Sequence, residues 1–414
     1  MMNTELCPVV VTSMSTLTAP ATRTAHHTGF WIVAGAFLFS MAFTTVPTPL
    51  YPIYEQRDGF GGFVVTLVFA AYAIGVMVAL YLAGHVSDWL GRRRLLIASV
   101  AIEALAAVLF LVWNDLPGLL VARFVSGVGV GTLTATATAY LAELRAVSHP
   151  HEERAKAATA ATVINTGGLA LGPLFGGLIA QFLPAPIVTP FVVFLVLLVA
   201  AVVLAIFVPE TVDVASSRRR YAPQRVSVPP EARATFVAAA IGAAAAFSAL
   251  GFFTALTASI VIGLLHLGGH LIAGLVVFGV MGASAASQFA FARVQGRRKL
   301  QLGIALMVVG LALVAVVGIA PSLALLLVGG IVAGAGVGLV FASSIGVAAA
   351  SARPDNRGEV LAGMFLAAYA GLSAPVIAVG VALAFFPISR VLVVFALAVL
   401  VIVVLAAVPL LRRR

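Results

Sequence analysis

The sequence is poor in charge and almost without cysteine. Only 9% of its 414 residues are Asp, Glu, Lys or Arg, whereas a soluble domain carries about 25%. The single cysteine, Cys7, excludes an intrachain disulfide and a cysteine-based metal site. The chain also lacks a nucleotide-binding loop and any constellation of catalytic side chains. We therefore expect no enzyme, no metal site and no cofactor.

Hydrophobic residues make up 62% of the chain, with a mean hydropathy of +1.15. A helix needs about 20 apolar residues to cross a bilayer. Four runs are long enough for one span each and four more are long enough for two. The chain is thus predicted to be an all-α membrane protein with twelve transmembrane helices. The single runs are 29–54, 60–84, 95–113 and 116–142, and the double runs are 157–208, 234–292, 300–352 and 360–411.

Basic residues predict the orientation. All but three of the 24 Lys and Arg lie in the tails or in loops on one side of the predicted membrane; the exceptions are Arg57, Arg123 and Arg390. The positive-inside rule then predicts a multi-pass protein of the cytoplasmic (inner) membrane with both termini cytosolic. The net charge is +10, and the basic residues are scattered in short clusters between apolar runs. We therefore expect a lipid bilayer, and no nucleic acid, as its partner.

The chain divides into two similar halves. DWLGRRRL (88–95) recurs as RVQGRRKL (293–300), and RFVSGVGVG (123–131) recurs as GIVAGAGVG (330–338). Parallel six-helix repeats with a site between them are typical of transporters. The chain is predicted to consist of a disordered cytosolic tail (1–28), a six-helix bundle (29–208), a cytosolic linker (209–233), a second six-helix bundle (234–411) and a basic cytosolic end (412–414).

Three motifs stand out: the loop GHVSDWLGRRR (84–94), RFVSGVGVG (123–131) in the fourth span and GLALGPLFGG (168–177) in the fifth. They resemble motifs of the major facilitator superfamily, and the resemblance covers essentially the whole chain from about residue 29. It implies two pseudo-symmetric six-helix bundles that open alternately to either side of the membrane. The fifth-span motif is typical of the antiporter branches, chiefly the drug/proton antiporters. The loop motif is carried by Gly84, Asp88, Gly91, Arg92, Arg93 and Arg94. The fourth-span motif is carried by Arg123, Gly127 and Gly129, and the fifth-span motif by Gly168, Gly172, Pro173, Gly176 and Gly177.

The loop motif is interpreted as part of a gate. Asp88 is expected to dock against the N-terminus of span eleven, near 356–359, where the helix dipole favours an anion. Gly91 allows a tight turn, and Arg92–Arg94 can pair with carboxylates such as Glu143 or Glu152. The alternative is a topology anchor, which explains the arginines but not Asp88.

The glycines of span five share one face, because Gly168, Gly172 and Gly176 recur every four residues. Such a face lets another helix approach closely. Span eight offers Gly282, Ala286 and Ala290 at the same spacing and is the candidate partner in the other half. Ordinary packing within one bundle is the alternative.

Two charges are expected inside spans, where each is costly unless it faces protein or water. We expect Glu103 and Arg123 to pair, or Arg123 to poise a carboxylate for proton exchange. A structural ion pair or polar helix contact is the alternative for Glu103. Asn165 is a tentative cavity residue. His266 and His270 are interpreted as a solvated turn rather than a metal site.

The favoured function is secondary active transport of a small amphiphilic or drug-like compound by proton-coupled efflux. The proton gradient would be the energy source, and the transporter is expected to work as a monomer. One alternative is a proton-coupled importer of a small metabolite such as an organic acid or sugar. Another is a membrane receptor that has lost transport.

Overall fold

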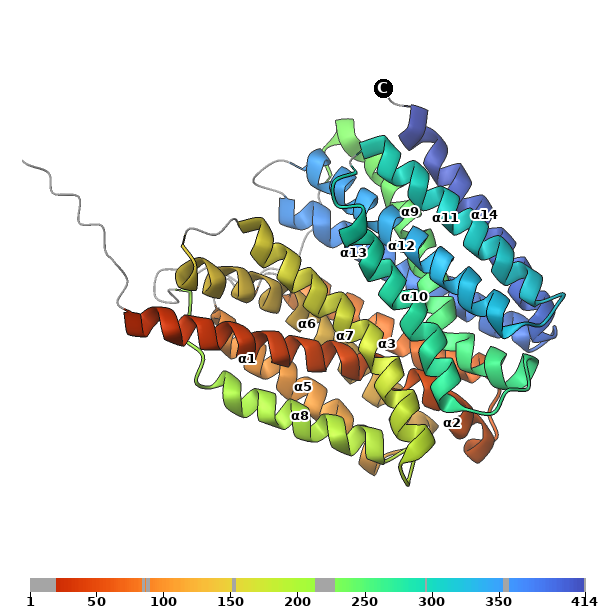
Figure 1. The fold of residues 1–414 in the computed structure, drawn as a ribbon, viewed down its shortest axis with the longest axis horizontal. Coiled ribbons are helices and arrows are strands. Elements are labelled where there is room, and N and C mark those ends of the chain that lie inside the picture. The colour runs from red at the N-terminus through yellow and green to blue at the C-terminus, as the bar shows by residue number, and fades with distance from the viewer. Residues whose placement is uncertain are drawn as a thin grey trace, which may run out of the picture.

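The computed structural model describes residues 20–83, 86, 90–150, 154–212, 228–294, 296–352 and 357–412. Within these ranges the chain forms a bundle of helices (Figure 1). The first half holds α1 (Pro20–Thr45), η1 (Thr48–Leu50), α2 (Tyr51–Asp58), α3 (Gly62–Ala83), α5 (Arg92–Val112), α6 (Leu116–Ser148), α7 (Arg154–Phe182) and α8 (Thr189–Ala205). The second half holds η3 (Pro230–Ala232), α9 (Arg233–Ser259), η4 (Ile260–Leu264), α10 (His270–Ala290), α11 (Gly296–Val317), α12 (Leu323–Ser351), α13 (Arg357–Leu383) and α14 (Ile388–Arg412).

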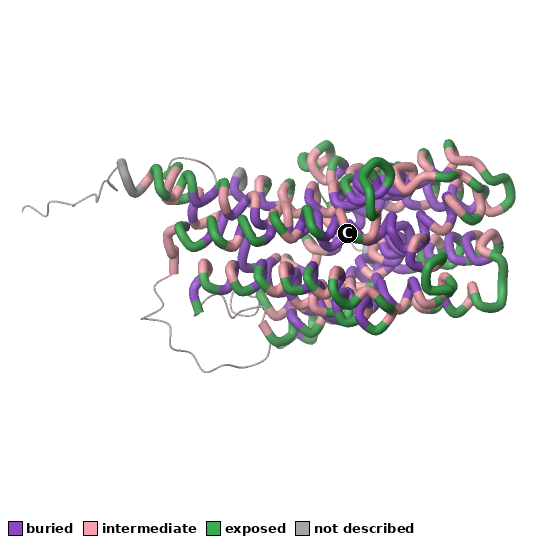
Figure 2. The backbone as a smooth tube through the Cα atoms, turned by 90° about the horizontal axis from the view of Figure 1, so that it is seen from below, coloured by how far each residue is buried: buried purple, intermediate pink, exposed green. Residues whose placement is uncertain are grey.

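The helices agree with the predicted membrane spans. In the described part of the chain, eleven helical segments are long and apolar enough to cross a membrane. The apolar helix α8 has 17 residues, the lower limit of roughly 17–25 residues for a span. The prediction of an all-α membrane protein with twelve spans is thus confirmed. Residues coloured as exposed lie on the outside of the bundle (Figure 2), and many of them are large and apolar, as a lipid-facing surface requires.

Each half is held together mainly by contacts within itself. In the first half α6 packs on α1, α3 and α5, and in the second half α12 packs on α9, α10 and α11. Two seams join the halves, one between α7 and α10 and the other between α3 and α13. We call the end of the bundle where α1 begins and α14 ends the terminal face, and the opposite end the distal face (Figure 1).

The first helix begins earlier than expected. The predicted disordered tail extends to residue 28, but α1 begins at Pro20, so the predicted boundary is wrong for residues 20–28. The stretch after Pro20 contains no glycine or further proline before Gly29, and nothing local stops the helix from extending beyond the apolar segment. Residues 1–19 lie outside the described part of the chain.

The same proline arrangement occurs in both halves. Pro173 lies inside α7 and lacks an N–H, so the carbonyl of Leu169 four residues earlier loses its helical donor. Thr45 of α1 donates to that carbonyl at 3.0 Å. In the second half Pro375 lies inside α13, and Ser248 of α9 donates to the carbonyl of Gly371 at 2.8 Å. A hydroxyl from a neighbouring helix therefore replaces the missing hydrogen bond in each half.

Candidate functional site

A buried arginine lies where α6 meets α1. The side chain of Arg123 is only 1% exposed. Its Nε donates to the hydroxyl of Tyr51 at 2.9 Å, and its Nη1 donates to the carbonyl of Thr44 at 2.5 Å. The Tyr51 and Tyr72 rings lie 5.5 and 5.7 Å from its Cζ. The guanidinium is therefore held by oxygen acceptors and aromatic faces, which stabilise a cation away from water.

The end of α1 supplies part of this environment. The helix ends at Thr45, just before the prolines in PTPLYP (47–52). The last carbonyls of a helix lack internal donors and carry a partial negative charge. The Thr44 carbonyl is one of them, and the cation of Arg123 satisfies it. The prolines of the first span thus help to create the acceptor for a buried charge.

The expected pairing of Glu103 with Arg123 is wrong. Glu103 is fully buried on α5, and its Oε2 accepts a hydrogen bond from Ser126 at 3.0 Å. Its other oxygen, Oε1, has no hydrogen-bond partner. A Cβ at Gly129 would lie 2.7 Å from that oxygen, so the missing side chain makes room for the carboxyl. The fourth-span motif therefore supplies one buried ionisable residue, Arg123, and makes room at Gly129 for a second, Glu103. The two form no ion pair with each other.

Four half-buried aromatic rings lie in the second half, on α9, α12 and α13. The Phe247 ring lies 4.7 Å from Phe341 and 5.7 Å from Tyr369, and Phe341 lies 6.0 Å from Phe365. Tyr369 also lies beside Tyr72 of α3 in the other half. The cluster extends from the boundary between the halves, close to the ring that covers Arg123.

The arginines of the loop motif bind within the first half. Gly91 has φ +99°, a conformation that favours glycine, directly before α5. Arg92 forms an ion pair with Glu143 at 3.2 Å, which confirms that predicted contact. The backbone N–H groups of Arg92 and Arg93 donate to the two carboxylate oxygens of Glu210 at 2.9 and 3.1 Å.

Glu210 thereby caps the positive end of α5, an interaction that the sequence reasoning missed. Arg94 is exposed at the same helix start. Gly84, Asp88, Glu152 and Asn356 lie outside the described residues. The docking of Asp88 against span eleven therefore stays a prediction.

The glycine face of span five packs on α1 rather than across the halves. A Cβ at Gly168 would lie 2.6 Å from Met41 Cβ, and one at Gly176 would lie 2.5 Å from the Val46 carbonyl oxygen. Gly172 likewise faces the Ala42 carbonyl. The alternative of packing within one bundle is thus the observed one for this face.

Span eight does contact span five, but through other residues than predicted. A Cβ at Gly177 would lie 2.6 Å from the His270 carbonyl oxygen, and Gly274 packs against the carbonyl of Pro173. The predicted partner Gly282 has no atom within 4 Å of an added Cβ. Residue spacing correctly indicated a small-residue face but not which neighbour it meets.

Three hydrogen bonds join the halves toward the distal face. The Ser259 hydroxyl donates to Glu55 Oε2 at 3.3 Å. The His270 backbone N–H donates to Gln181 Oε1 at 3.1 Å, and its ring Nδ1 lies 3.0 Å from the Pro49 carbonyl oxygen. His270 therefore links the halves rather than lying in a purely solvated turn.

Other candidate residues are less informative. Asn165 is half-buried in α7, and its side chain forms no hydrogen bond with the described part of the chain. In the same ranges no three His, Cys, Asp or Glu side chains gather as ligands for a metal ion.

Comparison with known proteins agrees with this arrangement of two helical halves around buried charges. The family model of the Major Facilitator Superfamily matches residues 32–374. The chain belongs to the major facilitator superfamily. The resemblance seen in its three motifs is thereby confirmed, and this is a family of multi-pass membrane transporters rather than enzymes.

Solved structures of other major facilitator proteins have the same fold. The human organic anion transporter MFSD10 superposes with a TM-score of 0.68 at 15% identity, covering 92% of this chain and 99% of that one. A variant of the nucleoside transporter NupG gives a TM-score of 0.72 at 14% identity with the same coverage. At such identities the likeness concerns the fold alone.

Curated relatives are similar over a shorter stretch. MdtD of Escherichia coli O1:K1 / APEC, a protein named for multidrug resistance, is 28% identical over 152 residues. MdtD of Shigella boydii serotype 18 matches to the same extent. The match covers 37% of this major facilitator chain and only 31% of the length of these relatives.

Proposed function

We propose that the protein exports small amphiphilic organic compounds from the cytosol in exchange for protons. The observation that carries this proposal is the cluster of half-buried rings beside the boundary between the halves, near a buried arginine that pairs with no carboxylate of the described residues. Aromatic walls with few polar groups suit an amphiphilic ligand. The similarity to proteins named for multidrug resistance supports the same class of substrate.

The orientation supports export from the inner membrane. The basic residues at the starts of α5 and α11, Arg92–Arg94 and Arg297–Lys299, lie at the terminal face. The positive-inside rule makes that face cytosolic. The hydrogen bonds at the distal face then close the outer side of the protein. In this state a compound would reach the aromatic cluster from the cytosol. Rocking of one half on the other along the α3–α13 and α7–α10 seams would expose it to the outside.

Glu103 is the proposed proton carrier. An ionised carboxyl within a membrane is costly unless it is paired, and Glu103 forms no ion pair with any residue that the structure describes, while its Oε1 has no hydrogen-bond partner among them. A neutral, protonated carboxyl avoids this cost. Arg123 lies on α6, the helix that also carries the Ser126 donor to Glu103. A move of its guanidinium toward the carboxyl would favour release of the proton.

The test is transport in inverted membrane vesicles with an acidic lumen, using ethidium and related amphiphilic dyes. Proton-driven accumulation of the dye in the lumen is the expected result for the wild-type protein. Glu103→Gln keeps the size of the side chain but cannot exchange a proton. It should lose pH-driven accumulation while dye counterflow, which needs no net proton movement, continues.

Substitution of the aromatic cluster separates substrate contact from coupling. Phe341→Ala should raise KM for the dye about three- to tenfold, because an aromatic contact is worth roughly 0.5–1.5 kcal/mol. Phe207→Ala is the control, since that ring is 76% exposed just after α8.

Accumulation of the dye in right-side-out vesicles with an inward proton gradient would instead identify an importer, and no flux of any compound would favour a receptor. Unchanged coupling in Glu103→Gln would remove that residue from the mechanism.

A further inference from the structure

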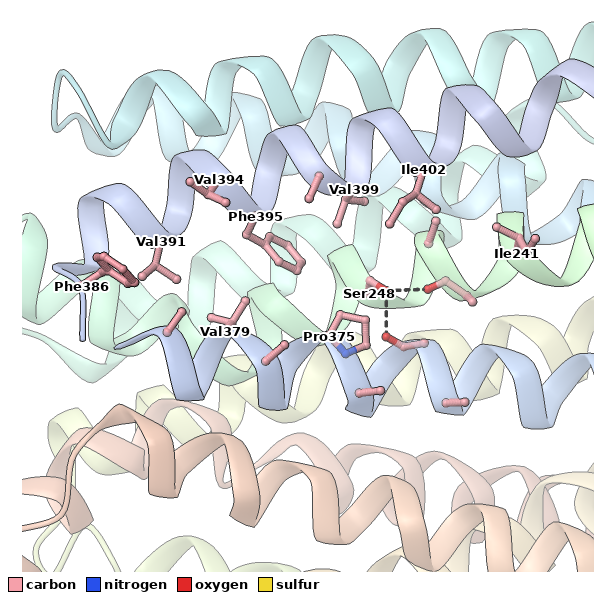
Figure 3. A pocket seen from close by; sticks show the side chains of 18 of the residues that line it. Ile241, Ser248, Pro375, Val379, Phe386, Val391, Val394, Phe395, Val399 and Ile402 are labelled. Atoms are coloured by element: carbon pink, nitrogen blue, oxygen red, sulfur yellow. Dashed lines mark hydrogen bonds between the residues drawn. The ribbon is translucent and has the colours of Figure 1, made fainter. Parts of the chain in front are cut away.

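A long groove lies between α13 and α14, with α9 as its floor (Figure 3). Its volume is about 800 Å³. Several lining side chains are strongly exposed, among them Phe386 at 53% and Val394 at 65%. Because these helices belong to the membrane-spanning part, the groove faces the lipid bilayer.

The walls of the groove offer almost no polar group to a ligand. Alanine, valine, isoleucine and phenylalanine side chains line most of it. The hydroxyl of Ser248 is engaged with the carbonyls of Ala244 and Gly371, as the dashed lines in Figure 3 show. An occupant of this part must therefore be apolar, since an unpaired polar group would lose its hydrogen bonds with water without replacement.

One end of the groove is different because it carries Arg390. This side chain is exposed and forms no ion pair with any residue that the structure describes. Arg390 lies in the first turn of α14, which contains no acidic residue. A cation is disfavoured at the positive end of a helix. An anion bound there would compensate both the guanidinium and the helix dipole.

The length of the groove fits one leaflet. It extends along α14 from Arg390 to Ile402, which is roughly 18 Å at the rise of an α-helix. Half of the hydrocarbon core of a bilayer is roughly 15 Å thick. A chain of that length would lie along the apolar walls while its headgroup reached the end of α14.

We propose that this groove is a binding site for a phospholipid, with its phosphate on Arg390 and an acyl chain between α13 and α14. The lipid belongs to the leaflet into which the α13–α14 turn reaches. The site is separate from the aromatic cluster, so the proposal does not depend on the direction or the substrate of transport. A bound chain would also fill the gap between two helices that otherwise share few contacts.

Native mass spectrometry of the full chain in detergent tests the proposal, with phosphatidylglycerol and diacylglycerol of the same chains as probes. The wild-type protein should bind one phosphatidylglycerol about tenfold more tightly than diacylglycerol, as expected for loss of one charge-assisted contact. Arg390→Ala should bind both probes with the same weak affinity. Arg390→Lys should restore most of the preference, because a lysine also binds phosphate.

A bulky residue in the groove tests the position of the acyl chain. Ala378→Trp fills the groove and should abolish binding of both probes. Ala200→Trp places the same ring on the exposed face of α8 and should behave as the wild type. Equal retention of phosphatidylglycerol by Arg390→Ala and wild type would overturn the proposal. So would displacement of the lipid by inorganic phosphate, which would identify a site for free anions.

Discussion

Two adjacent glycines in α7 allow a sharp test of how this helix packs. An added Cβ at Gly168 would lie 2.6 Å from Met41 Cβ and 2.7 Å from the Leu38 carbonyl oxygen, well inside van der Waals contact. At Gly167 an added Cβ meets nothing within 4 Å. Alanine raises helix propensity equally at both positions, by roughly 0.5–1 kcal/mol. The difference between Gly168→Ala and Gly167→Ala therefore isolates the packing of α7 on α1.

The expected difference is about 1–3 kcal/mol, the usual cost of overpacking a well-filled interface. Gly167→Ala should melt at or above the temperature of the wild type. Gly168→Ala should melt lower, by about 2–4 °C per kcal/mol for a unit of roughly 150–250 residues. Thermal unfolding of the purified variants in one detergent measures both. Equal melting temperatures would show that Gly168 does not touch α1 and would refute the assigned packing.

Three further substitutions test contacts of the site and its supports. Ser248→Ala leaves the Gly371 carbonyl without its donor and should cost about 1–3 kcal/mol, read as a lower melting temperature; an unchanged value would mean that the carbonyl finds another partner. Tyr51→Phe removes the hydroxyl that accepts from Arg123, and should reduce transport per molecule at normal expression, whereas full activity would make this contact dispensable. Glu210→Gln weakens the cap on α5 by about 0.3–1 kcal/mol, and its deficit in melting temperature should shrink at high salt; a salt-independent deficit would exclude a charge effect.

Hydropathy and motif spacing were sufficient to predict the fold. Long uncharged runs predict membrane helices because a bilayer core excludes unpaired charge, and the repeated motifs predict two similar halves. The burial of Arg123 follows from the same reasoning, since a charge within a span must face protein or water. The contact of Arg92 with Glu143 was also predictable, because both lie at the same end of neighbouring spans.

The partners of the buried charges could not be predicted in the same way. Counting residues from the end of a span gives the depth of Glu103 and Arg123, but not the direction in which each side chain points around its helix. In the structure Glu103 points to Ser126 while Arg123 points to the end of α1. The acceptor on α1 is the backbone carbonyl of Thr44. Every residue has such a carbonyl, so the type of residue gives no signal that predicts this contact.

The sequence contains a signal for the second proline site, namely a proline in the eleventh span. Pro375 occupies the same place in the second half as Pro173 does in the first, and each leaves one carbonyl free. The hydroxyls of Thr45 and Ser248 satisfy these carbonyls from equivalent helices. Recognising the pair requires knowledge of which helices are neighbours, and that comes from tertiary structure.

The distal closure has a consequence for the energetics of each transport cycle. It consists of three hydrogen bonds, from Ser259 to Glu55 and from His270 to Gln181 and Pro49. No ion pair joins the halves there among the described residues. Bonds of this kind contribute only about 0.5–1.5 kcal/mol each once exchange with water is counted. Water can replace all three bonds at this face, so the closed and open arrangements differ there by only a few kcal/mol in hydrogen-bond free energy. A ligand that binds one of the two arrangements more tightly than the other can supply that much.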